Sequence, residues 1–360
     1  MATIQDVAAQ AGVSVATVSR VMNGSPRVSP AAQARVLDAI DRLDYHPNLL
    51  GRNLRRTETR MVLVVLPTIA NPFYAGIVQG IEETAHREGY NVLLCNTASD
   101  PERERLYLNM LSQRLADGAI LLAPELGVQE LERLCRSHPL VQCCEYLEGA
   151  AVSHVTIDNR AAARDAVRHL VSLVHTRIGL VMFEPCYVSQ FARIYGYQDG
   201  MAEAGISYQQ NYFAEGDFGF ESGRAGGEQL LRLPGGVRPT AIFAGSDLMA
   251  MGVVQAAREA GLSVPKGLAV VGFDDIDVAT MGEPQLTTVA QPQHDLGRVS
   301  MEVLLRQLRG ESTVPEDIDL PHELRIRDST AGRTPGGEPK AVATESHRRN
   351  GRTWTAKARN

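Results

Sequence analysis

Residues 3–23 read TIQDVAAQAGVSVATVSRVMN, and this string contains two short helical patterns separated by a glycine. Thr3 followed by Asp6 is typical of a capping box at the start of a helix. Apolar residues then recur at helical spacing, and Gly12 stands where a left-handed C-cap would end the first helix. Ser14 can cap a second helix whose apolar side turns inward. The string predicts two helices joined by a tight turn, either a helix-turn-helix or another small helical hairpin.

The next residues predict a third helix and then a polar segment. Ser29 is a candidate N-cap, and Pro30 suits the first helical position because its missing amide costs nothing there. Residues 48–60 (NLLGRNLRRTETR) are too polar for a core. They form either a solvated linker or a hinge helix that is marginal alone and forms beside DNA, where Leu54 could wedge into a base step. The predicted head is a helix-turn-helix domain over residues 1–47 followed by this hinge.

The net charge of −6 is distributed unevenly along the 360 residues. Residues 1–60 contain eight arginines and five acidic residues, whereas residues 61–330 carry 35 acidic and 21 basic side chains. A cationic head on an anionic body is typical of a protein that touches DNA with one end only. The hydrophobic fraction of 44% and the charged fraction of 22% are those of an ordinary globular protein.

Several other classes of protein lack support in the sequence. No apolar run approaches the length of a membrane span and the N-terminus has no secretory apolar region, so we expect a cytoplasmic protein without membrane contact. The five cysteines lack the paired spacing of a zinc site, and neither a metal, a cofactor nor a disulfide framework is expected. The absence of nucleophile-elbow, Walker and H-E-x-x-H motifs argues against an enzyme. A transporter's solute-binding protein could share the body but would have no use for residues 1–60.

From residue 61 the pattern changes to strands that alternate with helices. Residues 61–66 form an unbroken apolar run, as expected of a parallel strand buried on both faces. Helix-length segments separate the further strands that we expect over residues 90–95, 119–122, 141–144, 177–182, 240–244 and 268–272. Repeated βαβ units form doubly wound parallel sheets with right-handed crossovers. Two such sets, near 61–160 and 161–290, predict an α/β body behind the all-α head.

The head, the hinge and the body together resemble the lactose–galactose repressor (LacI/GalR) family over about residues 2–330. Within the family the chain most resembles the cytidine repressors, and the purine repressors share several of the same short sequences. The resemblance rests on these residues: Gly51-Arg52-Asn53, Gly216-Asp217-Phe218 with Phe220-Glu221, GFDDID at 272–277, and LTT at 286–288 leading into AQP at 290–292. The resemblance implies a two-lobed fold like that of periplasmic sugar-binding proteins. Lobe 1 would comprise about 61–160 and 291–320, and lobe 2 about 161–290 and 321–330. It also implies a repressor that binds a pseudo-palindromic operator as a homodimer and is switched allosterically by a small effector between the lobes.

The second helix is the predicted DNA-reading element. Arg20 can make a bidentate contact to guanine, and the small residues can lie against thymine methyl groups. Val15 and Ala16 match the positions that differ most between family members, so operator preference is expected there. Hydroxyl and amide side chains nearby can contact phosphates and position the head without specifying a sequence. The predicted DNA-binding residues are Thr3, Ser14, Val15, Ala16, Thr17, Ser19, Arg20, Asn23, Tyr45, Asn48, Leu54 and Arg55.

The predicted effector site lies between the lobes, at the carboxyl ends of the strands. An arginine and a carboxylate that face each other, as Arg193 and Asp274 would, can hold ribose hydroxyls or ring nitrogens, and phenyl rings can stack on a base or a sugar. Simpler roles stay open, because Phe73 and Phe218 could be core residues and Asp274 could cap a turn. By family position, the predicted effector-binding residues are Phe73, Tyr74, Asp158, Ser189, Arg193, Phe218, Ser246, Asp274 and Gln291.

The predicted effector is a nucleoside such as cytidine, with a sugar or a purine base as the alternative. Where purine repressors have an arginine and a threonine, this chain has Tyr187 and Ser189, which disfavours a bare purine. The resemblance to cytidine repressors favours induction over corepression and suggests cooperation with a cyclic-AMP receptor protein. Residues 331–360 are rich in Gly, Pro, Thr and Arg and lack an apolar heptad, so a disordered basic tail without a tetramerising coiled coil is expected.

Overall fold

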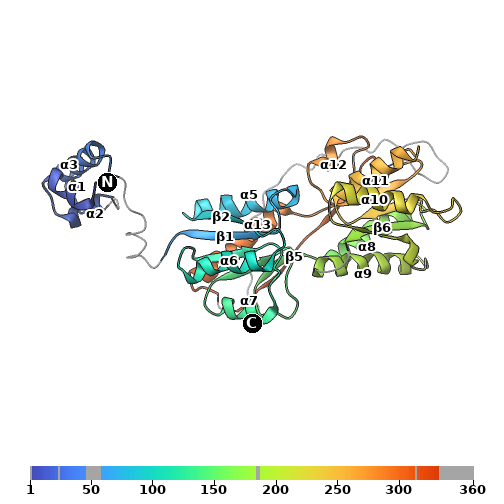
Figure 1. Cartoon of the computed structure of the whole chain (residues 1–360), viewed down its shortest axis with the longest axis horizontal. Coiled ribbons are helices and arrows are strands. Elements are labelled where there is room, and N and C mark those ends of the chain that lie inside the picture. The colour runs from blue at the N-terminus through green and yellow to red at the C-terminus, as the bar shows by residue number, and fades with distance from the viewer. Residues whose placement is uncertain (1, 23–24, 46–57, 184–186, 313, 332–360) are drawn as a thin grey trace, which may run out of the picture. The chain divides into compact units, whose positions relative to one another are not determined.

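The computed structural model describes residues 2–22, 25–45, 58–183, 187–312 and 314–331 (Figure 1). The chain divides into two compact units. One comprises residues up to Met61 together with Met110–Asp117, and the other comprises Val62–Asn109 and the chain from Gly118 onward. Within the described ranges, no helix has both the length and the apolar character needed to cross a membrane.

The head consists of three helices, α1 (Ile4–Ala11), α2 (Val15–Met22) and α3 (Pro30–Arg42). The predicted capping box is present, because the Thr3 amide and hydroxyl donate to Asp6 Oδ2 (2.8 and 2.7 Å) and Thr3 Oγ1 accepts from the Asp6 amide. Gly12 ends α1 with φ 63°, and Ser14 Oγ accepts from the Thr17 amide at the start of α2. The capping residues predicted from the sequence are therefore the ones that mark where these helices begin and end.

The three helices bury one shared apolar core. Its buried members are Val7, Ala8, Ala11, Val18, Val21, Val36, Ala39 and Tyr45. The predicted hinge falls largely on residues 46–57, which lie outside the described ranges. After them, the backbone amides of Thr59 and Arg60 donate to the Asp117 carboxylate (2.7 and 2.8 Å) just before the first strand.

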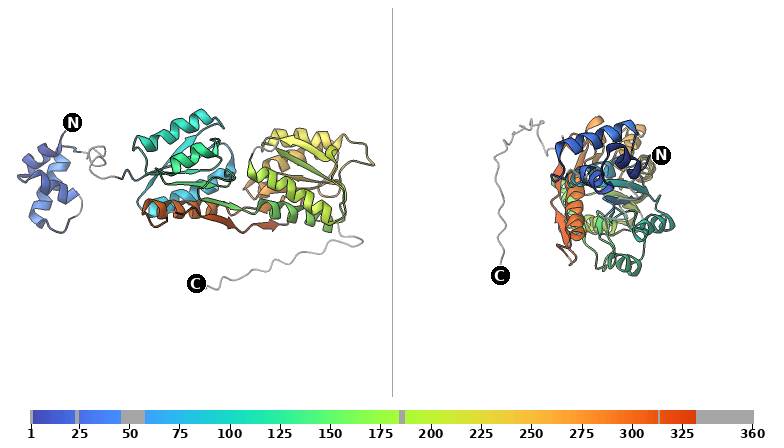
Figure 2. Two further views of the ribbon diagram at one scale, coloured as in Figure 1. Left: turned by 90° about the horizontal axis from the view of Figure 1, so that it is seen from below. Right: turned by 90° about the vertical axis from the view of Figure 1, so that its left-hand side faces the viewer.

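The first lobe of the body is built on a six-stranded sheet in the order β11-β5-β4-β3-β1-β2. Its strands are β1 (Met61–Leu66), β2 (Asn91–Asn96), β3 (Gly118–Leu121), β4 (Leu140–Cys143), β5 (His154–Ile157) and β11 (Asp317–Leu320). The pairs from β1–β3 through β5–β11 are parallel. Figure 2 shows helices on both faces of the sheet, with α5 (Pro72–Arg87) and α13 (Gln293–Leu308) on one, and α6 (Pro101–Ser112) and α7 (Val128–Cys135) on the other.

The second lobe is built on a second six-stranded sheet, in the order β12-β10-β9-β8-β6-β7. Its strands are β6 (Ile178–Phe183), β7 (Phe213–Gly216), β8 (Ala241–Ala244), β9 (Ala269–Asp274), β10 (Thr287–Ala290) and β12 (Glu323–Arg325). Only β12 is antiparallel among the paired strands that are described. The helices are α8 (Asn159–Ser172), α9 (Val188–Glu203), a 3₁₀ turn (Gln210–Tyr212), α10 (Phe220–Leu231), α11 (Asp247–Glu259) and α12 (Val278–Met281).

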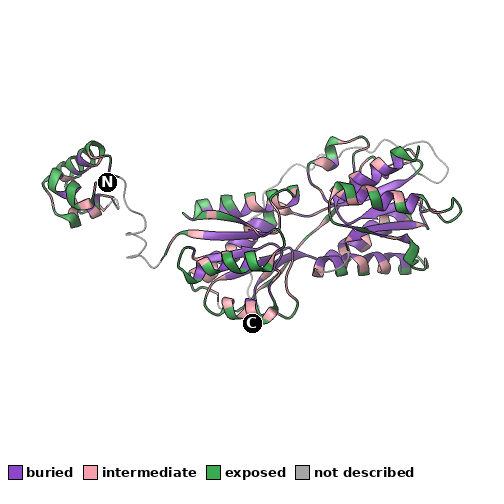
Figure 3. Cartoon of the chain, in the orientation of Figure 1, coloured by how far each residue is buried: buried purple, intermediate pink, exposed green. Residues whose placement is uncertain are grey.

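In the part of the chain that the structure describes, the backbone passes between the two sheets three times, after β5, β10 and β11. This arrangement confirms the predicted two-lobed, doubly wound fold. The seven predicted strands are present within about two residues at each end. Five strands had no prediction because they are only three or four residues long and carry polar residues, as in β7 (FAEG) and β11 (DIDL). The central strands are buried along nearly their whole length (Figure 3).

Three pairs of neighbouring helices approach closely through glycines. A Cβ atom on Gly80 of α5 would lie 2.0 Å from the carbonyl oxygen of His294, and one on Gly297 of α13 would lie 1.9 Å from that of Ile77. The α8–α9 and α10–α11 pairs have the same property at Gly196 and Gly223, where a Cβ would lie 2.2 Å from a carbonyl of the other helix. Because backbone meets backbone, these helices can pack more tightly than side chains would allow.

We expect Gly297→Ala to destabilise the body by about 1–3 kcal/mol, because α13 must move away from α5 to accommodate a methyl group. Urea unfolding followed by circular dichroism would measure the change. Gly236→Ala is the matched control, since a Cβ there meets nothing within 4 Å. Its effect should stay within about 0.5 kcal/mol. Equal losses in the two variants would contradict the close-packing argument.

Candidate DNA-binding face and ligand cavity

The outer face of α2 presents small side chains and one long cation. Val15, Ala16 and Arg20 are exposed, and Thr17 and Ser19 are half-buried. Small residues allow the helix backbone to approach base edges closely, while a guanidinium can reach and read a guanine. This face is therefore suited to enter a major groove.

Other predicted DNA-binding residues have structural roles within the head. Thr3 and Ser14 are the helix caps described above, and the Ser14 and Thr17 hydroxyl oxygens are 2.9 Å apart. The ring of Tyr45 packs in the head core, which accounts for its burial without a phosphate contact. Four further residues lie outside the described ranges, so their DNA contacts stay predictions: Asn23, Asn48, Leu54 and Arg55.

A cavity of about 360 Å³ lies between the two lobes of the body. Its lining combines aromatic rings, carboxylates, small polar groups and one guanidinium, from Pro67, Thr68, Asn71, Phe73, Tyr74, Ser99, Glu125, Glu145, Phe183, Tyr187, Arg193, Asp217, Phe218 and Asp274. Five of these are predicted effector-binding residues: Phe73, Tyr74, Arg193, Phe218 and Asp274. The volume suits a ligand of sugar or nucleoside size.

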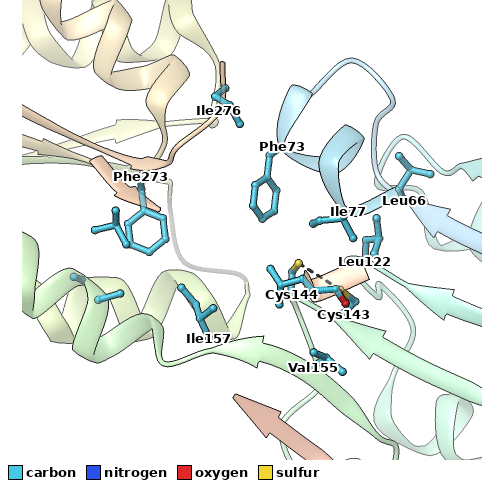
Figure 4. Close-up of a cluster of buried hydrophobic side chains, with 14 of the residues drawn as sticks. Leu66, Phe73, Ile77, Leu122, Cys143, Cys144, Val155, Ile157, Phe273 and Ile276 are labelled. Carbon is cyan, nitrogen blue, oxygen red and sulfur yellow. Dashed lines mark hydrogen bonds between the residues drawn. The ribbon is translucent and has the colours of Figure 1, made fainter. Parts of the chain in front are cut away.

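Aromatic rings from both lobes surround this space. Phe183 and Phe218 are stacked, with ring centroids 5.7 Å apart and planes 9° from parallel. Figure 4 shows Phe73, at the start of α5, on the lobe 1 side of this region, and Phe273, on β9, on the lobe 2 side. Phe73 lines the cavity, whereas Phe273 is fully buried beneath the Arg193 guanidinium. Such ring faces can stack on a flat heterocycle or on the apolar face of a sugar.

Arg193 and Asp274 are held in position by hydrogen bonds inside lobe 2. Arg193 Nε donates to Asn159 (2.9 Å) and Nη1 donates to the carbonyl of Gly245 (2.8 Å), and its guanidinium lies 3.7 Å from the centroid of the Phe273 ring. Asp274 Oδ1 accepts from Gln291 Nε2 (2.8 Å). Burial raises the pKa of Asp274 to about 7, against the opposing effect of the Arg193 charge.

The remaining predicted effector-binding residues do not line the cavity. Gln291 donates a hydrogen bond to Asp274 and helps to fix the orientation of that carboxyl group. Ser246 caps α11, where its hydroxyl accepts from the Met249 amide and donates to the carbonyl of Phe218 (both 3.1 Å). Asp158 caps α8 and lines a separate, smaller crevice together with Ser189.

Sequence reasoning missed two acids that connect the lobes. The Tyr187 hydroxyl donates to Glu125 Oε1, and the Ser189 hydroxyl donates to Glu145 Oε1 while its amide donates to Oε2 (3.2 Å). We call these two pairs the lobe bridges, since both acids follow strands of lobe 1 and both hydroxyls begin α9 of lobe 2. Burial raises the pKa of Glu145. A usable signal was present, because each acid comes shortly after a predicted apolar strand and the carboxyl ends of parallel strands share one edge.

Several residues at the cavity have left-handed backbones that are uncommon for side chains other than glycine. Ser99 (φ 54°), Phe218 (φ 66°) and Asp274 (φ 114°) line it, and Cys144 (φ 69°) precedes Glu145. Each such residue costs of the order of 1–3 kcal/mol, and clusters of them are typical of binding sites. The strain turns the chain at the strand ends so that these side chains reach the cavity.

Comparisons with known proteins cover both the head and the body. The model of bacterial regulatory proteins of the lacI family matches residues 3–48, and that of the periplasmic binding protein-like domain matches residues 167–330. Catabolite control protein A of Priestia megaterium is 38% identical over 332 residues, which cover 91% of this chain and 99% of that protein. The transcriptional repressor CytR of Escherichia coli K12 is also 38% identical, over 330 residues that cover 91% and 96%. Equal identity to both does not single out the cytidine repressors.

Two solved structures extend the similarity to the tertiary level. A lac repressor dimer bound to operator and the anti-inducer ONPF has a TM-score of 0.83 and 29% identity, covering 91% of this chain and 99% of that one. The complex of the regulator CelR with cellobiose has a TM-score of 0.69 and 35% identity, covering 91% and 100%. The helix-turn-helix head, the two-lobed body and these matches along nearly the whole chain agree with one another. The chain belongs to the LacI family of bacterial regulatory proteins and is a DNA-binding transcriptional repressor.

Proposed function

We propose that this repressor binds a pseudo-palindromic operator as a homodimer and is released when a nucleoside such as cytidine occupies the interlobe cavity. The observation that carries the proposal is that the cavity is lined from both lobes. A ligand can shift a conformational equilibrium only through different affinities for the two states. A molecule that touches both lobes has that property, because its contacts depend on the angle between them.

The chemistry of the cavity supports a nucleoside. The stacked pair Phe183 and Phe218 offers a face for a flat base, and Arg193 with Asp274 can hold the hydroxyls of a ribose. The Tyr187 and Ser189 hydroxyls are engaged in the lobe bridges, which disfavours their use in gripping a bare purine. A sugar is the second candidate, favoured by the similarity to the CelR–cellobiose complex.

The proposed homodimer has candidate surfaces on the body. β2 is an edge strand of its sheet and exposes Leu93 (37%) and Leu94 (47%), while Met281 on α12 is 75% exposed. Exposed apolar side chains beside a sheet edge favour pairing with another copy. A symmetric dimer would present two α2 helices to the two halves of a palindrome.

We expect Arg20→Ala to weaken operator binding by about 1–3 kcal/mol and to relax preference at one base position. Fluorescence anisotropy on an operator obtained by in vitro selection, and on its single-base variants, would measure both effects. Arg42→Ala is the control, because Arg42 is exposed on α3 and pairs with Asp38 (3.0 Å). A loss that is uniform across all duplexes would identify Arg20 as a phosphate contact instead.

We expect cytidine affinity to fall roughly tenfold between pH 8 and pH 6, because Asp274, with a pKa of about 7, must lose its proton to accept ligand hydroxyls. Calorimetric titration would measure this dependence. Asp274→Asn should weaken cytidine binding and make the remaining affinity nearly independent of pH. Glu104→Gln is the control, since burial also raises the pKa of Glu104 to about 7. If that variant flattened the profile instead, the titrating group would be Glu104.

We expect Tyr187→Phe to weaken cytidine binding by about three- to tenfold, because a side-chain hydrogen bond contributes about 0.5–1.5 kcal/mol and this one joins the lobes. Operator release should then need correspondingly more cytidine. Tyr195→Phe, at an exposed position of the same helix (49%), is the matched control and should leave both quantities unchanged. Similar effects in the two variants would show that the hydrogen bond between Tyr187 and Glu125 does not contribute to cytidine binding.

A further inference from the structure

We infer that the interlobe cavity selects ligands without an anionic group and rejects their phosphate esters. The inference rests on the proposed function, because it concerns the nucleoside or sugar that the cavity would take. It adds a rule about ligand charge that separates a nucleoside from a nucleotide and a sugar from a sugar phosphate.

The charges that line the cavity are unbalanced. Four carboxyl groups line it, from Glu125, Glu145, Asp217 and Asp274, whereas Arg193 is the single cation among the lining residues that the structure describes. Glu125 and Glu145 belong to lobe 1, and Asp217 and Asp274 belong to lobe 2. A ligand between the lobes therefore faces carboxyl groups from both sides.

The one cation among these described residues is already engaged in part by the protein. Two nitrogens of the Arg193 guanidinium donate to Asn159 and to the carbonyl of Gly245, and its plane lies against Phe273. The charges of Asp274 and Glu145 act on it as opposite charges. A phosphate is normally held by several charged donors in a fork. The hydrogens left on Nη1 and Nη2 of Arg193 are the only cationic donors in the described lining, and four carboxyl groups line the same space.

At helix N-termini, the usual alternative for binding a phosphate, side chains of the chain itself already accept from backbone amides near this cavity. At α9, Glu145 accepts from the amide and the hydroxyl of Ser189. At α10, Asp217 Oδ1 accepts from the Gly219 amide (2.8 Å), and at α5, Asn71 Oδ1 accepts from the Phe73 amide (3.0 Å). Two of these three groups are carboxylates, so a phosphate that approached these helix starts would meet a negative charge beside the backbone donors.

Burial makes further negative charge costly. It raises the pKa of both Glu145 and Asp274, since each carboxyl group already has difficulty holding its charge there. A phosphate dianion would add repulsion in a space of low dielectric constant. Hydroxyl and amine groups have the opposite effect, because they donate hydrogen bonds to the carboxyl oxygens.

Paired calorimetric titrations of the full chain test this inference. The pairs are cytidine and cytidine 5′-monophosphate, ribose and ribose 5-phosphate, and glucose and glucose 6-phosphate. We expect the uncharged member of at least one pair to bind and its ester to bind at least about a hundredfold more weakly. An ester that binds as tightly as its parent, or more tightly, overturns the charge rule and leaves the proposed function standing. If no member of any pair binds, the proposed effector class fails, and the charge rule fails with it.

Two controls separate charge from bulk. 5′-O-acetylcytidine adds comparable bulk without charge and should bind within a few-fold of cytidine; its equal rejection would show a steric limit and overturn the inference. The double variant Glu125→Gln, Glu145→Gln keeps the shape of the cavity and should narrow the preference for cytidine over its monophosphate at least tenfold. Glu311→Gln, at an exposed position outside the lining, should leave that preference unchanged. A preference that the double variant leaves unchanged would also overturn the inference.

Discussion

The hydrogen bonds of the lobe bridges connect the two halves of the body at the cavity. Glu125 and Glu145 follow strands of one lobe, and the hydroxyls of Tyr187 and Ser189 begin a helix of the other. Half-buried carboxyl groups need donors, and here the donors come from across the cavity. The angle between the lobes is therefore coupled to the same groups that a ligand would touch. Under the proposed function, this coupling is what a small molecule would use to act on DNA binding.

The packing elsewhere in the body leaves the angle between the two lobes as the part of the structure that can change most easily. Within each lobe the helices are packed backbone to backbone through glycines such as Gly196 and Gly297, which permits little sliding. Only three crossings of the chain connect the sheets. A change in ligand occupancy would then be expressed as movement between rigid lobes rather than as deformation inside one of them.

The residues at the cavity fall into an oriented pair and a set that surrounds it. Arg193 and Asp274 are oriented by neighbours that do not line the cavity, such as Asn159 and Gln291. The rings and acids that surround this pair in the lining have an excess of carboxyl groups. Selectivity would then come from which groups are repelled as much as from which are bound.

The sequence by itself determined the features that depend on neighbouring residues. The capping box at Thr3, the C-cap at Gly12 and the apolar run at 61–66 each follow from contacts within a few positions of the chain. Five of the residues predicted from family positions to bind an effector line the cavity. Only the tertiary structure decided that Tyr187 meets Glu125, that Glu145 fills the start of α9, and that Gly297 faces a carbonyl of α5. These partners are far apart along the chain, and their meeting depends on how sheets and helices pack, which no local pattern encodes.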